Sequence, residues 1–129
     1  MATFLLDTSV IIDTINEKRG RRQFLKELVE QGHILACCAI NVAEVHAGLR
    51  PKEEEKTESF LGALEYYAIG IRVAESGGLL KRDYSRRGIT LSLADAVIAA
   101  VAIHHRLTLI TDNTKDFPMK DLALYPLPN

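Results

Sequence analysis

The stretch from Ser92 to Ile103, SLADAVIAAVAI, constrains the fold of this chain most strongly. Ten of its twelve residues are apolar, so a helix formed there is apolar on nearly every side. Such a helix is normally buried on nearly every side. Asp95 interrupts the stretch, and a buried carboxylate is costly unless another group compensates for it. The stretch therefore predicts a buried helix and raises the question of what Asp95 does there.

Short apolar runs alternate with helical patterns along the rest of the chain. We expect strands at residues 3–6, 33–38 and 107–110, with an edge strand at 122–127. We expect helices at residues 8–16, 21–32, 40–49, 51–67, 70–88 and 92–105, with Thr8 or Ser9 capping the first and Asn41 the third. This alternation indicates an α/β fold with a mostly parallel central sheet flanked by helices. The length of 129 residues suits one domain, residues 1–129.

Polar residues directly follow two of the expected strands. Asp7 comes after residues 3–6, and Thr111, Asp112 and Asn113 come after residues 107–110. Sites in parallel sheets form outside the carboxyl ends of the strands. Both groups are therefore predicted to lie along the same sheet edge.

Two more acids, Glu44 and Asp95, each lie three residues after a capping candidate, Asn41 and Ser92. At that spacing each acid could simply face the free N–H groups and the dipole at its own helix start. A capping acid prefers a solvated helix end, however, and these two lie in strongly apolar sequence. A shared acidic site is the alternative interpretation.

In that interpretation Asp7, Glu44, Asp95 and the segment 112–116 converge on one point. Carboxylates at close range repel one another, and a divalent cation relieves the repulsion. Ligands that are all oxygen suit Mg²⁺ or Mn²⁺ rather than zinc. Such ions activate water and stabilise the attacking and leaving oxygens in phosphodiester cleavage. We expect Asp7 and Asp95 to contact the metal, and Glu44 to bind the same ion or act through a coordinated water.

Four motifs spread over almost the whole chain resemble the PIN domain, in particular the VapC-type toxin ribonucleases of toxin–antitoxin pairs. FLLDTSVIID is similar to the opening strand of the family and contains Asp7. AINVAEVHAGL is similar to the second motif and contains Glu44, and LSLADAVIAAVAI resembles the third and contains Asp95. LTLITDNTKDF resembles the final motif, in which a strand is followed by Thr, then Asn, then Asp-Phe.

The resemblance implies a Rossmann-like, three-layer PIN fold and an endoribonuclease that depends on Mg²⁺ or Mn²⁺. It also implies a toxin that a small antitoxin protein inhibits, and a homodimer. In the final motif the family places the fourth ligand at the Asn or the Asp, here Asn113 or Asp116, and we favour Asp116. Thr111 and Asn113 are then expected to provide hydrogen bonds, and the hydroxyls of Thr8 and Ser9 to orient Asp7. Asp112 has a simpler explanation as a solvated turn residue after a strand.

The net charge of −1 provides no global basic field that would attract nucleic acid, so RNA binding has to use local patches. One basic cluster contains Lys18, Arg19, Arg21 and Arg22, and a second contains Lys81, Arg82, Arg86 and Arg87. Arg82, Arg86 and Arg87 are candidates for contact with the RNA backbone, and a solvated helix face is the alternative. Asp13 is expected on the exposed side of the first helix.

The acid at position 7 argues against a signal peptide, and no apolar run is long enough to span a bilayer. We therefore expect a cytoplasmic protein with no membrane partner, in which Cys37 and Cys38 are buried thiols. A dehalogenase-type phosphatase would need a second Asp at position 9, where this chain has Ser9. A catalytically inactive PIN-like module that binds RNA or protein remains the alternative function.

Overall fold

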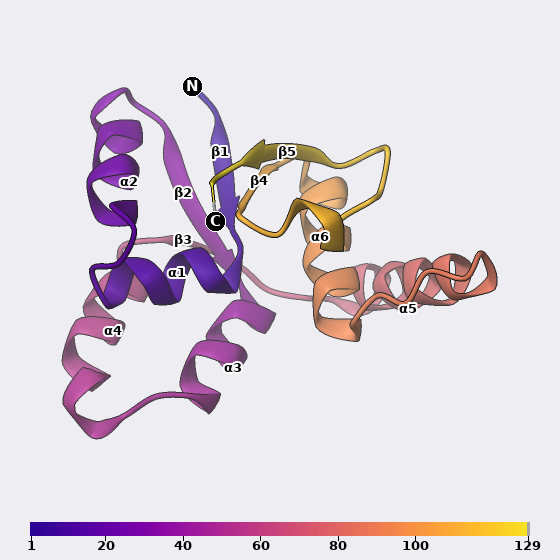
Figure 1. Ribbon diagram of the computed structural model, residues 1–129, viewed down its shortest axis with the longest axis horizontal. Coiled ribbons are helices and arrows are strands. Elements are labelled where there is room, and N and C mark those ends of the chain that lie inside the picture. The colour runs from indigo at the N-terminus through magenta and orange to yellow at the C-terminus, as the bar shows by residue number, and fades with distance from the viewer. Residues whose placement is uncertain (129) are drawn as a thin grey trace.

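The computed structural model describes residues 1–128, and within them a single central sheet contains five strands. The strands are β1 (Thr3–Leu6), β2 (Ile34–Cys38), β3 (Glu65–Tyr67), β4 (Thr108–Thr111) and β5 (Ala123–Pro126). Every neighbouring pair is parallel, and the order across the sheet is β3-β2-β1-β4-β5 (Figure 1). The strand order reverses at β1, which lies between β2 and β4. The carboxyl ends of β1 and β4 therefore flank the switch point at which α/β sheets form their sites.

Six α-helices connect and cover the strands of residues 1–128. They are α1 (Thr8–Ile15), α2 (Arg21–Glu30), α3 (Ala39–Ala47), α4 (Glu54–Gly62), α5 (Ile71–Arg86) and α6 (Leu93–His105), and two short 3₁₀ turns are η1 (Pro51–Glu53) and η2 (Thr114–Asp116). Figure 1 shows α5 and α6 on one side of the sheet and α1, α2 and α4 on the other. The predicted three-layer α/β fold is therefore confirmed.

Each face of the sheet has its own hydrophobic core because neighbouring residues of a strand point to opposite faces. Leu5 of β1 packs in the core beneath α6, whereas Phe4 and Leu6 pack in the core beneath α1 and α2. The buried thiols of Cys37 and Cys38 are divided between the two cores in the same way.

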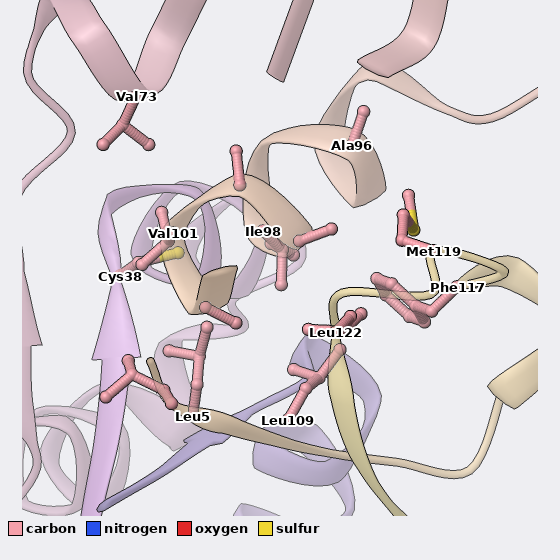
Figure 2. Close-up of a cluster of buried hydrophobic side chains, with 14 of the residues drawn as sticks. Leu5, Cys38, Val73, Ala96, Ile98, Val101, Leu109, Phe117, Met119 and Leu122 are labelled. Atoms are coloured by element: carbon pink, nitrogen blue, oxygen red, sulfur yellow. The ribbon is translucent and has the colours of Figure 1, made fainter. Parts of the chain in front are cut away.

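Helix α6 forms the middle of the first core, as its composition predicts. Its residues are buried without a break from Ala96 to Ala102. Figure 2 shows Ile98 and Val101 of α6 between the sheet residues Leu5 and Leu109 and the α5 residue Val73. The first turn is less enclosed, since Leu93 is 56% exposed and Asp95 is half-buried. The burial of α6 therefore stops where Asp95 lies.

A close approach between α5 and α6 depends on Gly77. A Cβ atom at this position would lie 2.8 Å from Cγ2 and 2.9 Å from Cα of Val97. Gly77 therefore allows the two helices to touch, and it does not interrupt α5, which is helical as expected. Among the helices of residues 1–128, none is both long enough and apolar enough to cross a membrane.

One of the predicted helices was wrong in detail. The helix expected at 51–67 ends at Gly62, and Glu65–Tyr67 form the edge strand β3 instead. This strand has only three residues, two of them exposed, so no alternating apolar pattern marks it.

The expected caps of α1 and α3 were also wrong, whereas Ser92 caps α6 as expected. Helix α3 begins at Ala39, so Cys38 is the N-cap and Asn41 is at the third helical position. In α1 the cap is Asp7 rather than Thr8 or Ser9.

Candidate active site

Asp7 occupies the end of β1 and the start of α1, and its carboxylate is buried, with 6% of the residue exposed. Its Oδ1 accepts a hydrogen bond from the backbone N–H of Thr8 at 2.8 Å. Its Oδ2 accepts a hydrogen bond from the hydroxyl of Thr111, at the end of β4, at 2.7 Å. The predicted meeting of the two strand ends at one sheet edge is confirmed by this contact.

Glu44 reaches the same edge from α3. Its Oε1 accepts a hydrogen bond from the Thr8 hydroxyl at 2.6 Å, and that hydroxyl accepts one from Nδ2 of the buried Asn41 at 3.0 Å. The amide oxygen of Asn41 in turn accepts a bond from the Cys38 backbone at 2.8 Å, which fixes the side chain. The capping explanation for Glu44 fails because α3 starts too early for Glu44 to be in its first turn. The expectation of apolar surroundings was wrong as well, since Glu44 is exposed.

Asp95 lies in the first turn of α6. The Ser92 hydroxyl caps α6 and accepts a hydrogen bond from the Asp95 backbone N–H at 3.0 Å. Its carboxyl group nevertheless has a raised pKa, chiefly because of burial, against which the hydrogen bond with Ser92 acts. The negative charges of Asp116 and Glu44 raise the pKa further. The side chain of Asp95 therefore lies near two acids from other elements.

The charges of the acids link the whole group. Burial raises the pKa of Asp7 to about 6, although the hydrogen bonds from Thr111 and Thr8 oppose the shift. The charges of Asp95 and Asp112 raise it further. The acids Asp7, Glu44, Asp95 and Asp116 are thus linked through their charges, and they come from the junction of β1 with α1, from α3, from α6 and from η2. Repulsion within such a set favours binding of a cation.

Asp112 is not the solvated turn residue that was expected. It is 7% exposed, and it accepts a hydrogen bond from the Ser9 hydroxyl at 2.9 Å. Arg21 lies 3.4 Å and Arg19 lies 3.5 Å from its Oδ2. The Ser9 hydroxyl therefore holds Asp112 rather than Asp7, and the Thr8 hydroxyl holds Glu44.

Asn113 and Asp13 have specific places near this edge. The backbone N–H of Asn113 donates to the Thr111 hydroxyl at 2.9 Å, so it helps to orient the group that binds Asp7. Asp13 was expected on an exposed face, but its side chain is only 15% exposed and lies 3.6 Å from Arg19. Neither the arginine pairs of Asp112 nor the role of Asn41 could be read from sequence, because the partners lie far apart in the chain.

Comparison with known families identifies the chain. The sequence profile described as the PIN domain matches residues 4–122. The chain belongs to the PIN-domain family. The four motifs noted above all fall within the matched range.

Individual relatives of this PIN domain agree with the assignment. Ribonuclease VapC19 of Mycobacterium tuberculosis is 33% identical over 117 residues, which cover 89% of this chain and 92% of the relative. A toxin–antitoxin complex from Klebsiella pneumoniae contains a chain that is 31% identical, with a TM-score of 0.75 and coverage of 98% and 100%. The fold is also that of VapBC2 from Rickettsia felis bound to a fragment of its promoter DNA, at 24% identity, a TM-score of 0.85 and coverage of 97% and 98%.

The donor set of this PIN domain fits a hard divalent cation. The four acids Asp7, Glu44, Asp95 and Asp116 offer only oxygen ligands, and two of them have pKa values that a nearby cation would lower again. Within residues 1–128, no three acidic, histidine or cysteine side chains are close enough as they stand to hold one ion. Ligation of a shared ion would therefore require these side chains to rotate toward it.

The candidate RNA-binding arginines lie on or beside the C-terminal half of α5. Arg82 pairs with its neighbour Asp83 at 3.0 Å, and the guanidinium of Arg87 lies 4.0 Å from the centre of the Tyr84 ring. Arg86 is exposed. Among the contacts of residues 1–128, none joins these arginines to the acidic set. Their contact with RNA stays a prediction.

Proposed function

We propose that this PIN domain is a metal-dependent endoribonuclease and the toxin of a toxin–antitoxin pair. The proposed catalytic residues are Asp7, Glu44, Asp95 and Asp116, of which Asp7, Glu44 and Asp95 would bind Mg²⁺ or Mn²⁺. One observation carries the proposal: the buried Asp7 has a raised pKa to which the charge of Asp95 contributes, and the charges of Glu44 and Asp116 in turn raise the pKa of Asp95. The similarity to a named ribonuclease at 33% identity supports RNA as the substrate.

Each residue has a distinct part in the proposed site. The bound cation would lower the pKa of a water molecule and stabilise charge on the phosphate. Thr111 and the Thr8 backbone hold both oxygens of Asp7 in fixed positions, and the Thr8 hydroxyl holds Glu44. These hydrogen bonds orient Asp7 and Glu44 at the sheet edge, and the carboxylates that bind the shared ion would still rotate toward it.

A cleavage assay tests this proposal. The purified protein should cleave RNA in Mg²⁺ or Mn²⁺ and stop when EDTA is added, whereas zinc alone should substitute poorly. Asp95→Asn should abolish cleavage, and Asp121→Asn, which changes an exposed acid outside the acidic set, should not. Cleavage that continues undiminished in EDTA would rule out the metal mechanism.

The inactive binding module is the less favoured alternative, because all four acids are present. The two functions differ in their metal binding. A catalytic site should bind Mn²⁺ in a way that depends on Asp7 and Asp95, whereas an inactive module should not.

We also propose how an antitoxin would silence the site. An Arg or Lys of the partner would enter among Asp7, Glu44 and Asp95, where a guanidinium can pair with carboxylates through two bonds. A groove between α2 and α4, lined in part by Leu25, Val29 and Phe60, offers an apolar surface to the same partner. Binding of the antitoxin should weaken as the Mn²⁺ concentration rises, and an affinity that ignores metal would place the partner elsewhere.

Helices α5 and α6 carry exposed apolar side chains that could form an interface. We propose a homodimer, for which the exposed apolar side chains of Ile71, Leu79 and Leu93 on α5 and α6 supply surface. The proposed location is the cytoplasm, where the RNA substrate is found. Light scattering of the purified protein tests the dimer.

A further inference from the structure

Two arginines lie beside the acidic set, and both contact the buried Asp112. Arg21 and Arg19 are 3.4 Å and 3.5 Å from its Oδ2, while Ser9 holds its Oδ1. The charge of Asp112 is among those that raise the pKa of Asp7. Asp112 therefore links the two guanidinium groups to Asp7, one of the proposed catalytic carboxylates.

The side chain of Arg21 is buried. Its side chain is 4% exposed, and its Nη2 donates a hydrogen bond to the carbonyl of Pro128 at 2.6 Å. Its Nε is buried without a hydrogen bond and lies 4.0 Å from Oδ2 of Asp13. Arg21 thus pairs with Asp112 inside the protein and is not accessible to a ligand.

Arg19 differs because its side chain is 54% exposed. Only Nη1 is engaged, at 3.6 Å from Asp13 and 3.5 Å from Asp112. Within residues 1–128, Nη2 and Nε of Arg19 have no hydrogen-bond or ion-pair partner. Two carboxylates therefore hold one end of the guanidinium while its Nη2–Nε edge is left for another acceptor.

The loop between α1 and α2 contains left-handed backbone. Arg19 has a φ of 56°, and Glu17 in the same loop has a φ of 54°, in the left-handed region that residues with a Cβ rarely adopt. The next residue, Gly20, has a φ of 67°. Glu17 ends α1 in an ordinary helix C-cap, in which the backbone N–H of Lys18 donates to the carbonyl of Asp13 at 2.8 Å. The side chain of Arg19 is placed by its contacts with Asp13 and Asp112, 3.6 Å and 3.5 Å away.

The acidic set would repel an RNA strand, and a nearby cation would reduce this repulsion. The site presents Asp7, Glu44, Asp95 and Asp116 to a polyanion, and a bound metal would compensate for only part of that charge. A guanidinium edge with two parallel N–H groups matches the two free oxygens of a phosphodiester. Arg82 and Arg87, by contrast, are engaged with Asp83 and Tyr84 and have no contact that leads to the site.

We infer that Arg19 binds the RNA backbone, with its Nη2–Nε edge on a phosphate next to the bond that is cut. This inference rests on the proposed function and assigns a substrate contact to that same site. The contact is with the backbone, so it is blind to base sequence and contributes to affinity rather than to the chemical step.

The test compares two arginines from the same segment. Arg19→Gln removes the proposed contact, and Arg22→Gln is the matched control, since Arg22 is 71% exposed and pairs with Glu17 at 2.6 Å. Both variants lose one positive charge. The probe is a fluorescein-labelled pool of random-sequence single-stranded RNA. Binding is measured by anisotropy in Ca²⁺, under conditions that keep the RNA intact, and cleavage is measured in Mg²⁺.

Arg19→Gln should weaken binding and raise KM by about 10-fold, as expected for loss of a charged hydrogen-bonded contact, with kcat nearly unchanged. The slope of log affinity against log salt should fall by about 0.7. Arg19→Lys should restore the slope but only part of the affinity, because it keeps the charge and loses the fork. Arg22→Gln should behave as wild type in both measurements.

Other outcomes separate the inference from the proposed function. If wild type cleaves RNA and Arg19→Gln leaves affinity and slope unchanged, or if Arg22→Gln weakens binding equally, Arg19 is not the contact and the ribonuclease stands. A wild type that neither cleaves nor binds RNA overturns both. Should Arg19→Gln melt at a much lower temperature, Arg19→Asn gives the same test, since Asn tolerates a positive φ.

Discussion

Neutralising Asp7 should stabilise the metal-free protein at neutral pH and have no such effect in acid. Burial raises the pKa of this carboxyl group from 3.8 to about 6 in the folded chain. An acid whose pKa is raised on folding binds its proton more tightly in the folded state. The loss in free energy of unfolding that ionised Asp7 causes is therefore absent below pH 4, grows between pH 4 and pH 6, and is fully present above pH 6.

The size of the effect follows from the same two values. Each pKa unit corresponds to about 1.4 kcal/mol, so ionised Asp7 lowers the free energy of unfolding by about 3 kcal/mol at pH 7.5. For a chain of this length that corresponds to about 10 °C in the melting temperature. Asp7→Asn removes the charge, but its amide N–H₂ group faces the Thr111 hydroxyl in place of Oδ2. The free-energy cost of that mismatch is the same at every pH. The change with pH in the stability difference between the variant and wild type therefore reports the ionisation of Asp7 alone.

Thermal or urea unfolding of wild type and Asp7→Asn in EDTA, from pH 4 to pH 7.5, measures the difference. The stability of the variant relative to wild type should rise by about 3 kcal/mol across this range. Asp121→Asn, which alters an exposed acid outside the site, should follow wild type at each pH. A relative stability that is flat, or that falls as the pH rises, would refute the assignment of a destabilising buried charge to Asp7.

Three further predictions concern the same fold and site. Asp7→Ala and Asp95→Ala should each reduce ribonuclease activity by about 100-fold or more. The double variant should be little worse than either single variant, because residues that act as one unit are not additive in kinetics. Effects that simply multiply in the cleavage assay would contradict a shared site. Ser92→Ala should cost about 1 kcal/mol in a denaturation experiment, as for an ordinary helix cap, and keep nearly full activity; activity lost as completely as in Asp95→Ala would instead make Asp95 a capping residue. Gly77→Ala should destabilise the protein by about 1–3 kcal/mol because its Cβ would lie 2.8 Å from Val97 of the neighbouring helix. Gly78→Ala should stabilise the protein by about 0.5–1 kcal/mol, since its Cβ would meet no atom within 4 Å beyond its chain neighbours and the backbone of its own helix. Equal melting temperatures for the two variants would contradict the close contact of α5 with α6.

Local pattern was sufficient to predict much of this molecule. Apolar runs of strand length and helical spacing located β1, β2, β4 and α6, because the burial of one face leaves a periodic trace in the sequence. The position of Asp7 and Thr111 at one edge followed as well, since all strands of a parallel sheet end on the same side. Ser92 and Asp95 could be placed in one helical turn from their spacing alone.

Other features depended on the tertiary structure. The proximity of Thr111 and Asp7 was expected, but the contacts of Asp112 with Arg21 and Ser9 were not. Arg21 is 91 residues and Ser9 is 103 residues away from Asp112 in the chain. The strand Glu65–Tyr67 also forms without a periodic pattern, because its hydrogen bonds come from pairing with β2. Periodicity records which side of an element is buried. It does not record which distant group supplies the hydrogen bond or the opposite charge, and that is decided only when the elements pack.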